Sequence, residues 1–267
     1  MAQCDLIVTD VTSYGDLFCV AGWDRVSGRM IRPEPPGANV AVESSRFWSG
    51  QYAGPGRAFD VGNVVRFTAN PADPNFPFPH ATEDRIVNLA QPLTILETLS
   101  VPALATAAAG SVSPGLEVAF DNELIRPASG KAYVLAGKNV RSLGAVEIPA
   151  SKLSFYENDY DPNRPKLRAK VTIGTQVFDL SVPALAARTR WKNAGLAGLR
   201  ADLKECDKVH IRVGLSRPLP HLNAWLIGCD ATYDLRSSQE QTRNNWRPYT
   251  GFSSNGLLGL DARTMPI

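Results

Sequence analysis

The sequence has few of the residues that build metal centres and disulfide-rich folds. It contains 3 histidines and 4 cysteines in 267 residues, and no two cysteines have CxxC spacing. Because these cysteines stand in apolar, strand-like segments, we expect buried free thiols rather than disulfides or a zinc site. The residues concerned are Cys4, Cys19, Cys206 and Cys229. We expect no metal site and no cofactor.

Long apolar runs are also missing. No segment of 18 uncharged apolar residues occurs, so no membrane span is expected. The first ten residues, MAQCDLIVTD, carry acidic side chains where a signal peptide has a basic start and an apolar core. These features predict a cytoplasmic protein.

The familiar catalytic motifs are absent as well. There is no GxSxG or HExxH, and no GxGxxG follows a strand-like segment. The segment Ser129-Gly130-Lys131 is similar to the end of a phosphate-binding loop. However, Ile125 replaces the first glycine of that motif and Ala132 replaces its final Ser or Thr. We therefore assign no catalytic residue, and whether the chain is an enzyme stays open.

One compact polar cluster is present, at residues 80–84. A histidine beside two carboxylates, here His80, Glu83 and Asp84, has the groups for acid–base chemistry or for holding a hard cation. The same residues after Pro79 are equally typical of a turn. The enzyme hypothesis, with a nucleotide or small molecule as substrate, depends on this cluster.

Charge is nearly balanced overall but unevenly distributed. The net charge of +2 argues against a dedicated nucleic-acid coat. Residues 1–100 carry 7 basic and 11 acidic side chains, whereas segment 164–192 carries seven basic residues and only Asp179 as an acid. Such a distribution either orients a polyanion or forms a solvated basic face.

The 21 glycines and 20 prolines favour short strands and turns over long helices. Alternating apolar residues predict strands throughout, with Gly174-Thr175 as a two-residue hairpin turn. The predicted strands lie at residues 6–8, 17–23, 30–31, 59–67, 86–87, 93–96, 153–156, 167–173, 176–180, 209–215 and 224–232. A mainly β protein with a few short helices, arranged as two small Greek-key barrels of the OB type in tandem, fits this pattern. We place the first barrel at 1–97, a connector with a short helix at 98–139, the second barrel at 140–235 and a tail at 236–267.

The hairpin of residues 17–37 carries the first candidate binding residues. Phe18 and Val20 alternate with Cys19, Ala21 and Trp23, and prolines from Pro33 onward stop its second strand. An indole beside guanidinium groups either stacks on a base and holds a phosphate, or covers the rim of a barrel. The candidates here are Trp23, Arg29 and Arg32.

A second set lies in the basic segment. We expect a helix from Val182, on which Arg188 and Lys192 share one face and Trp191 lies beside Arg188. Basic residues interleaved with an aromatic one follow a phosphate backbone while a base stacks, although Trp191 would equally anchor the helix to a barrel. This set comprises Arg168, Arg188, Arg190, Trp191 and Lys192.

Two further arginines lie near the last predicted strands. Arg212 falls on the polar side of the strand at 209–215, and Arg217 stands in the loop that follows it. Loops at this position face ligands in OB barrels, but a loop arginine also pairs with a nearby Asp at little cost.

Several segments together resemble the prokaryotic dual OB-containing domain family. They are FCVAGWD, GRMIRP, FDVGNVVRF and PHATEDRIV in the first half, then SLGAVEI, KLRAKVTIG–QVFDLSVP, HIRVGLSRPLP and AWLIGCDATY in the second. The match covers roughly residues 5–235, apart from 98–138. The resemblance implies two OB-like barrels and a role in binding nucleic acid or a nucleotide. The usual Trp before the first Ile-Arg-Pro is here Met30, which removes a candidate base-stacking platform.

The sequence therefore predicts non-catalytic binding of single-stranded nucleic acid or a nucleotide by two OB-like barrels. Two alternatives remain at this point: an enzyme that uses His80, Glu83 and Asp84, and an interaction module that docks a protein partner.

Overall fold

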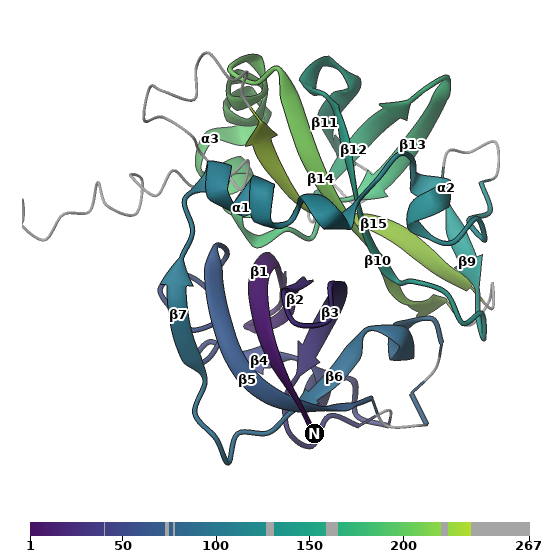
Figure 1. The fold of residues 1–267 in the computed structure, drawn as a ribbon. Helices are drawn as coiled ribbons and strands as arrows, with labels where there is room; N and C mark the ends of the chain where they lie inside the picture. Colours follow the sequence, from purple (N-terminus) through teal and green to yellow (C-terminus); the bar gives the residue numbers. More distant parts are fainter. Residues whose placement is uncertain are drawn as a thin grey trace, which may run out of the picture.

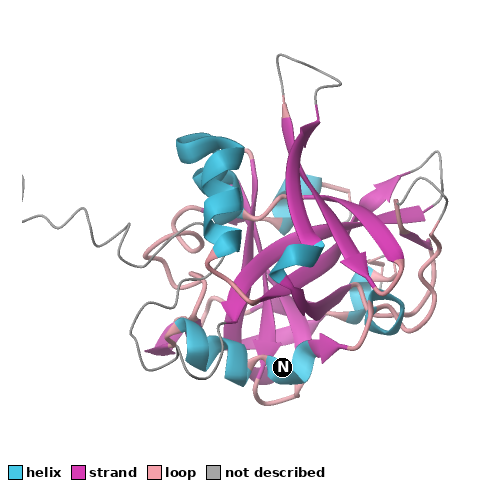
Figure 2. Ribbon diagram, turned by 90° about the horizontal axis from the view of Figure 1, so that it is seen from above, coloured by secondary structure: helices cyan, strands magenta, loops and turns pink. Residues whose placement is uncertain are grey.

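The computed structural model describes residues 1–235 apart from 40, 73–74, 77, 127–130, 159–164 and 220–223. Strands are the predominant secondary structure, and helices lie around them (Figure 2). The predicted fold class is confirmed as mainly β, whereas the helix α3 (Leu185–Lys204), with 20 residues, is longer than the short helices expected. The predicted tail at 236–267 lies outside the described residues. None of the helices in the described ranges is long and apolar enough to cross a membrane.

The N-terminal strands form one sheet, which we call the first sheet. Its strands are β1 (Ala2–Tyr14), β2 (Leu17–Asp24), β3 (Arg29–Glu34), β4 (Trp48–Ser49), β5 (Asn63–Pro71), β6 (Asp84–Val87) and β7 (Thr94–Thr98). The order of pairing is β1-β2-β3-β6-β5, and β5 also pairs with β1, so the pairings lead back to the first strand. The β3–β6 pair is parallel and the other four are antiparallel. Two short 3₁₀ segments, η1 (Glu43–Arg46) and η2 (His80–Thr82), lie in its loops.

Strand β1 pairs with both β2 and β5 because it is long and contains an irregularity. Its residues 2–7 pair with β5, its residues 6–14 pair with β2, and the register shifts between Val8 and Asp10. A bulge of this kind bends a strand and increases its twist, which lets one strand turn between two partners.

The hairpin of β2 and β3 forms as the sequence predicts. Val20 and Ile31 pack into the core of the first sheet, whereas Ala21 and Met30 face outward. One detail differs from expectation, because β3 continues through Pro33 to Glu34 and ends only before Pro35. Pro33 is tolerated in this position because the antiparallel pairing with β2 ends at Ile31, and on the β6 side the donor is Arg32, whose N–H bonds to the Glu83 carbonyl at 2.9 Å.

The C-terminal strands form the second sheet. Its strands are β8 (Val112–Ser113), β9 (Tyr133–Leu135), β10 (Leu143–Pro149), β11 (Leu153–Asn158), β12 (Lys166–Ile173), β13 (Gln176–Ser181), β14 (Lys208–Leu219) and β15 (Ala224–Leu235). They pair in the order β11-β12-β13-β15-β14-β10-β8, with β9 on β15. The predicted turn at Gly174-Thr175 joins β12 to β13, where Ile173 faces Gln176.

Helices and 3₁₀ segments connect and cover these strands. They are α1 (Val101–Ala107), η3 (Ala109–Ser111), α2 (Leu116–Ala119), η4 (Ala150–Lys152) and α3 (Leu185–Lys204). The helix expected from Val182 thus begins three residues later, at Leu185, and it is kinked at Gly195, where φ is 61°. Gly195 adopts this left-handed conformation easily because it has no Cβ.

The two sheets lie against each other. In Figure 1 the purple and blue strands of the first sheet lie below the green and yellow strands of the second, and α1 lies at the junction. Trp23 packs there with Ala21, Met30 and Leu143. A Cβ on Gly110 would come within 2.9 Å of the Trp23 ring, so only glycine allows this close approach. The outer face of β2 and β3 is therefore covered by the second sheet.

Candidate functional site

The outer surface of β11, β12 and β13 gathers basic side chains around a tyrosine. Along β12, Leu167, Ala169 and Val171 are buried in the core, because alternate residues of a strand point to opposite sides. The intervening residues point outward and include Lys166, Arg168 and Lys170. Tyr156 of β11 pairs directly with Arg168. We call Tyr156, Lys166, Arg168 and Lys170 the basic face.

Hydrogen bonds fix part of the basic face and leave part of it exposed. The Tyr156 hydroxyl donates to Asp179 Oδ1 at 2.6 Å, and Arg168 Nε donates to the same oxygen at 3.0 Å. The Lys170 ammonium lies 5.4 Å from the centre of the Tyr156 ring, in reach of a cation–π contact. Burial, followed by the hydrogen bond to Asp179, raises the pKa of Tyr156, so the ring stays neutral. Lys166 and Lys170 are exposed to solvent.

The candidates on α3 are mostly engaged within the protein. Arg188 donates to Ser13 Oγ at 3.1 Å, which joins α3 to β1. Arg190 pairs with Asp202 at 2.8 Å. Trp191 packs against the core of the second sheet and donates its indole N–H to Glu157 Oε1 at 2.7 Å. Trp191 therefore anchors the helix, as one of its two interpretations expected, while Lys192 is exposed.

The candidates near the first sheet divide between the surface and the interface. Arg29 is exposed at the end of the hairpin. Arg32 and Arg212 are only 5% and 1% exposed, respectively, and Trp23 packs between the sheets. All three point away from the core of their own sheet, as strand periodicity predicts, but the opposing sheet covers that side. A nucleic-acid strand bound at the protein surface would therefore not reach these three side chains. The side chain of Arg217 lies outside the described structure.

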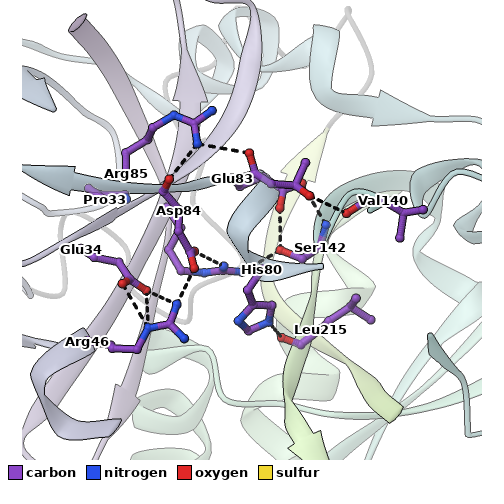
Figure 3. Close-up of polar contacts among 12 residues, drawn as sticks. Pro33, Glu34, Arg46, His80, Glu83, Asp84, Arg85, Val140, Ser142 and Leu215 are labelled. Atoms are coloured by element: carbon purple, nitrogen blue, oxygen red, sulfur yellow. Dashed lines mark hydrogen bonds and ion pairs between the residues drawn. The ribbon is translucent and has the colours of Figure 1, made fainter. Parts of the chain in front are cut away.

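A buried polar cluster fills the interface between the sheets (Figure 3). Arg46 donates to both carboxylate oxygens of Glu34, at 2.9 and 3.1 Å from Nε, and also to Asp84 Oδ2. Arg32 donates to Asp84 Oδ1 at 2.6 Å. Asp84 therefore lies between two guanidinium groups, and all three side chains are buried.

The cluster continues across the interface through Glu83. Its carboxylate accepts hydrogen bonds from the backbone N–H of Ser142 at 2.9 Å and from the Ser142 hydroxyl at 2.7 Å. The same hydroxyl lies 3.2 Å from Arg32 Nη2, so Ser142 links the two acidic residues to the second sheet. His80 Nε2 lies 2.8 Å from the Leu215 carbonyl, on β14. Residues from both sheets therefore share one hydrogen-bond network.

The hydrogen bonds and ion pairs of residues 80–84 give this cluster a structural role in joining the two sheets. His80, Glu83 and Asp84 are each 6% exposed or less, and their hydrogen-bond partners include arginines, a serine and a carbonyl of the protein itself. Among the described residues no group of three or more His, Cys, Asp or Glu side chains is arranged to hold a metal ion. Cys4, Cys19 and Cys206 are free thiols, of which Cys4 is buried, and burial raises its pKa to about 11.

Burial also gives the cluster a pH dependence. Burial raises the pKa of Glu83 from 4.5 to about 7, even though the hydrogen bonds from Ser142 favour its charged form. Between about pH 4.5 and pH 7 the folded protein thus holds a proton that the unfolded chain releases, so stability falls as pH rises through this window. Burial likewise raises the pKa of Glu34 and of Asp10 to about 6, which acts in the same direction.

We expect Glu83→Gln to remove much of this pH dependence. The rise in the pKa of Glu83 from 4.5 to about 7 corresponds to on the order of 3 kcal/mol in the free energy of unfolding. Relative to wild type, the variant should gain stability between pH 5 and pH 8, as measured by denaturant unfolding at several pH values. Glu205→Gln, at an exposed position, is the matched control and should follow wild type. An unchanged pH profile for Glu83→Gln would contradict this account.

A cavity of about 240 Å³ lies beside the buried cluster and is lined by both sheets. Asp10, Arg32, Glu34 and Arg46 contribute from the first sheet and its loops, and Ser181 contributes from β13. Sequence reasoning missed this cavity. The available signal was the run Thr9-Asp10 and Thr12, polar residues in a strand whose other side is apolar, which indicates a covered polar surface.

Comparisons with known proteins assign no relative to this chain: no family model, no curated protein and no solved structure matches it. The resemblance to the dual OB-containing family therefore stays a prediction.

Proposed function

We propose that this protein binds single-stranded nucleic acid or a nucleotide, without catalysis, and that the basic face is the contact surface. The observation that carries the proposal is the alternation of Lys166, Arg168 and Lys170 on one side of β12, next to Tyr156. With Asp179 included, the surface has a net positive charge of two. Proteins that bind single strands combine positive charge along the nucleic-acid backbone with an aromatic ring on which bases stack.

The strand order supports an OB-type arrangement for the second sheet. Strands β10 and β11 are separated only by η4 and can be counted together as one bent first strand, with β12, β13, β14 and β15 as the second to the fifth. The strands then pair in the order first, second, third, fifth, fourth, and the fourth pairs with the first. The third and fifth strands, β13 and β15, are parallel, and α3 lies between the third and the fourth. In the first sheet β1, β2, β3, β5 and β6 follow the same order, with β3 parallel to β6.

This arrangement favours the basic face over other surfaces. OB folds bind oligonucleotides on the face of their second and third strands, which here are β12 and β13. The equivalent face of the first sheet, on β2 and β3, is covered at the interface. Lys166 and Lys170 stand four residues apart, about 13 Å along an extended strand, a length that spans a few nucleotides.

A salt titration tests the proposal. Fluorescence anisotropy with a labelled oligo-dT of twelve nucleotides should show binding at low salt that weakens as salt is added. Each phosphate contact contributes roughly −0.7 to the slope of log affinity against log salt, so two to four contacts give about −1.5 to −3. A mononucleotide titration in parallel distinguishes a strand from a nucleotide as the ligand. Absence of binding to any of these probes at low salt would overturn the proposal.

A further inference from the structure

The cavity between the sheets has a buried inner end and an exposed outer end. Its lining residues Asp10, Arg32 and Arg46 are 3%, 5% and 5% exposed, whereas Tyr14 is 54% exposed and Ser181 is also accessible. None of the four residues of the basic face lines the cavity, although the lining residue Ser181 pairs directly with Arg168. The cavity is thus a different site that opens to solvent beside the basic face.

Asp10 is the lining residue whose hydrogen bonding is incomplete. Its carboxylate is buried just beyond the bulge of β1, and one oxygen, Oδ2, accepts from the Thr9 hydroxyl at 2.5 Å. The other oxygen, Oδ1, has no hydrogen-bond partner in the described part of the chain. A buried acceptor without a donor is costly, so a ligand that presents N–H groups to Asp10 would remove that cost.

The surrounding charges restrict which donor fits. Arg212 and Arg32 are the arginines that act on the Asp10 carboxylate, and Arg46 also lines the cavity. The charged lining residues balance, Asp10 and Glu34 against Arg32 and Arg46, which favours a neutral ligand over a cation or an anion. Arg32, Arg46 and the Thr12 hydroxyl supply the donors for an acceptor on the ligand. A neutral molecule that carries N–H donors next to an acceptor therefore suits the site.

Size and shape narrow the choice to a small planar molecule. The volume of about 240 Å³ lies below the roughly 300–1,000 Å³ typical of sites for drug-sized ligands. At its outer end Tyr14 and Phe47 stack almost in parallel, with ring centres 4.8 Å apart and an angle of 3°. Aromatic rings at an opening favour a flat heterocycle.

We infer that this cavity binds a guanine base, whose ring N–H and exocyclic amino group donate to the Asp10 carboxylate. These two donors are adjacent on one edge, as the two oxygens of a carboxylate require, and the neighbouring carbonyl oxygen accepts from a lining donor. Adenine and cytosine present one amino donor beside an acceptor nitrogen, so they match Asp10 less well. The inference does not depend on the proposed function, since it concerns a different site.

Isothermal titration calorimetry of the full chain with free nucleosides tests the ligand. Guanosine should bind, and inosine, which lacks the amino group, should bind at least tenfold more weakly, since it loses one hydrogen bond to a charged acceptor. Adenosine and cytidine should bind more weakly than inosine. Agmatine, a guanidinium compound, should not bind. Equal affinities for the four nucleosides, a preference for agmatine, or no binding because the cavity holds water alone would overturn the inference.

Two variants test the residues. Asp10→Asn should weaken guanosine binding at least tenfold, because it replaces an acceptor oxygen by a donor, while Asp16→Asn at an exposed position of the same hairpin should not. Ser181→Phe, at the exposed end, should block the cavity without touching Asp10, so the inference stays testable if Asp10→Asn fails to fold. Wild-type guanosine affinity in either folded variant would contradict it. Asp10→Asn should leave oligo-dT binding unchanged, which separates this site from the basic face.

Discussion

Replacement of Asp84 by alanine is expected to lower the free energy of unfolding by about 3–5 kcal/mol. Asp84 is fully buried and accepts hydrogen bonds from Arg32 and Arg46, whose side chains are 6% and 4% exposed. Without Asp84, Arg32 loses its buried carboxylate partner, and Arg46 keeps one of its two carboxylate partners in the described structure, Glu34. Removal of one member of a buried ion pair leaves an uncompensated charge, which costs far more than the pair itself contributes.

Denaturant unfolding measures this loss directly. Glu97→Ala is the matched control, because Glu97 pairs with Arg25 at 2.6 Å at an exposed position, where the two side chains are 48% and 39% accessible. Exposed pairs contribute roughly 0–1 kcal/mol, so the control should change stability little. If Asp84→Ala lost no more than Glu97→Ala, the buried cluster would not hold the two sheets together.

Reversal of charge on the basic face is expected to weaken oligo-dT binding on the order of a hundredfold at low salt. The variant Lys166→Glu/Lys170→Glu replaces two exposed cations by anions and so adds repulsion as well as removing contacts. The salt slope should become shallower by about 1.4, since each lost phosphate contact removes roughly 0.7. Both side chains point to solvent, but the new carboxylate at position 170 would lie directly opposite Asp179, so a loss of stability of roughly 0.2–1 kcal/mol is expected from the two like charges.

The control for this variant has the same change in net charge at another location. Lys131→Glu/Lys204→Glu alters two exposed lysines outside β12 and should lower affinity only a few-fold. Equal losses in the two double variants would show that net charge, rather than the basic face, governs binding. Anisotropy at several salt concentrations distinguishes these outcomes.

Local signals in the sequence predict local structure well. The hairpin at Gly174-Thr175 forms in the expected register because two residues fix such a turn. The strand expected at 59–67 begins only at Asn63, although Phe59 is fully buried, because an apolar residue in a loop gives the same signal as one in a strand. The alternation of apolar residues along a strand predicts which side chains point away from the core of their own sheet. It does not predict whether another sheet covers those side chains.

The site depends on contacts that no local pattern encodes. Arg32 and Ser142 meet across 110 positions and Arg46 and Asp84 across 38, so the buried cluster follows from the packing of the two sheets. For the same reason Arg32 and Arg212 were predicted at a surface and lie in the interface. Arg168 was identified from charge alone, whereas Tyr156 becomes part of the basic face only through the pairing of β11 with β12.

Photo-crosslinking tests the central proposal most directly. An oligonucleotide that carries 5-bromodeoxyuridine reacts on irradiation with aromatic side chains stacked against the base, and mass spectrometry identifies the modified residue. The account predicts that Tyr156 is the principal site, and that Tyr156→Phe, which keeps the ring, retains the crosslink at that position. Crosslinks confined to other aromatic residues, such as the exposed Tyr14 at the cavity, would contradict it.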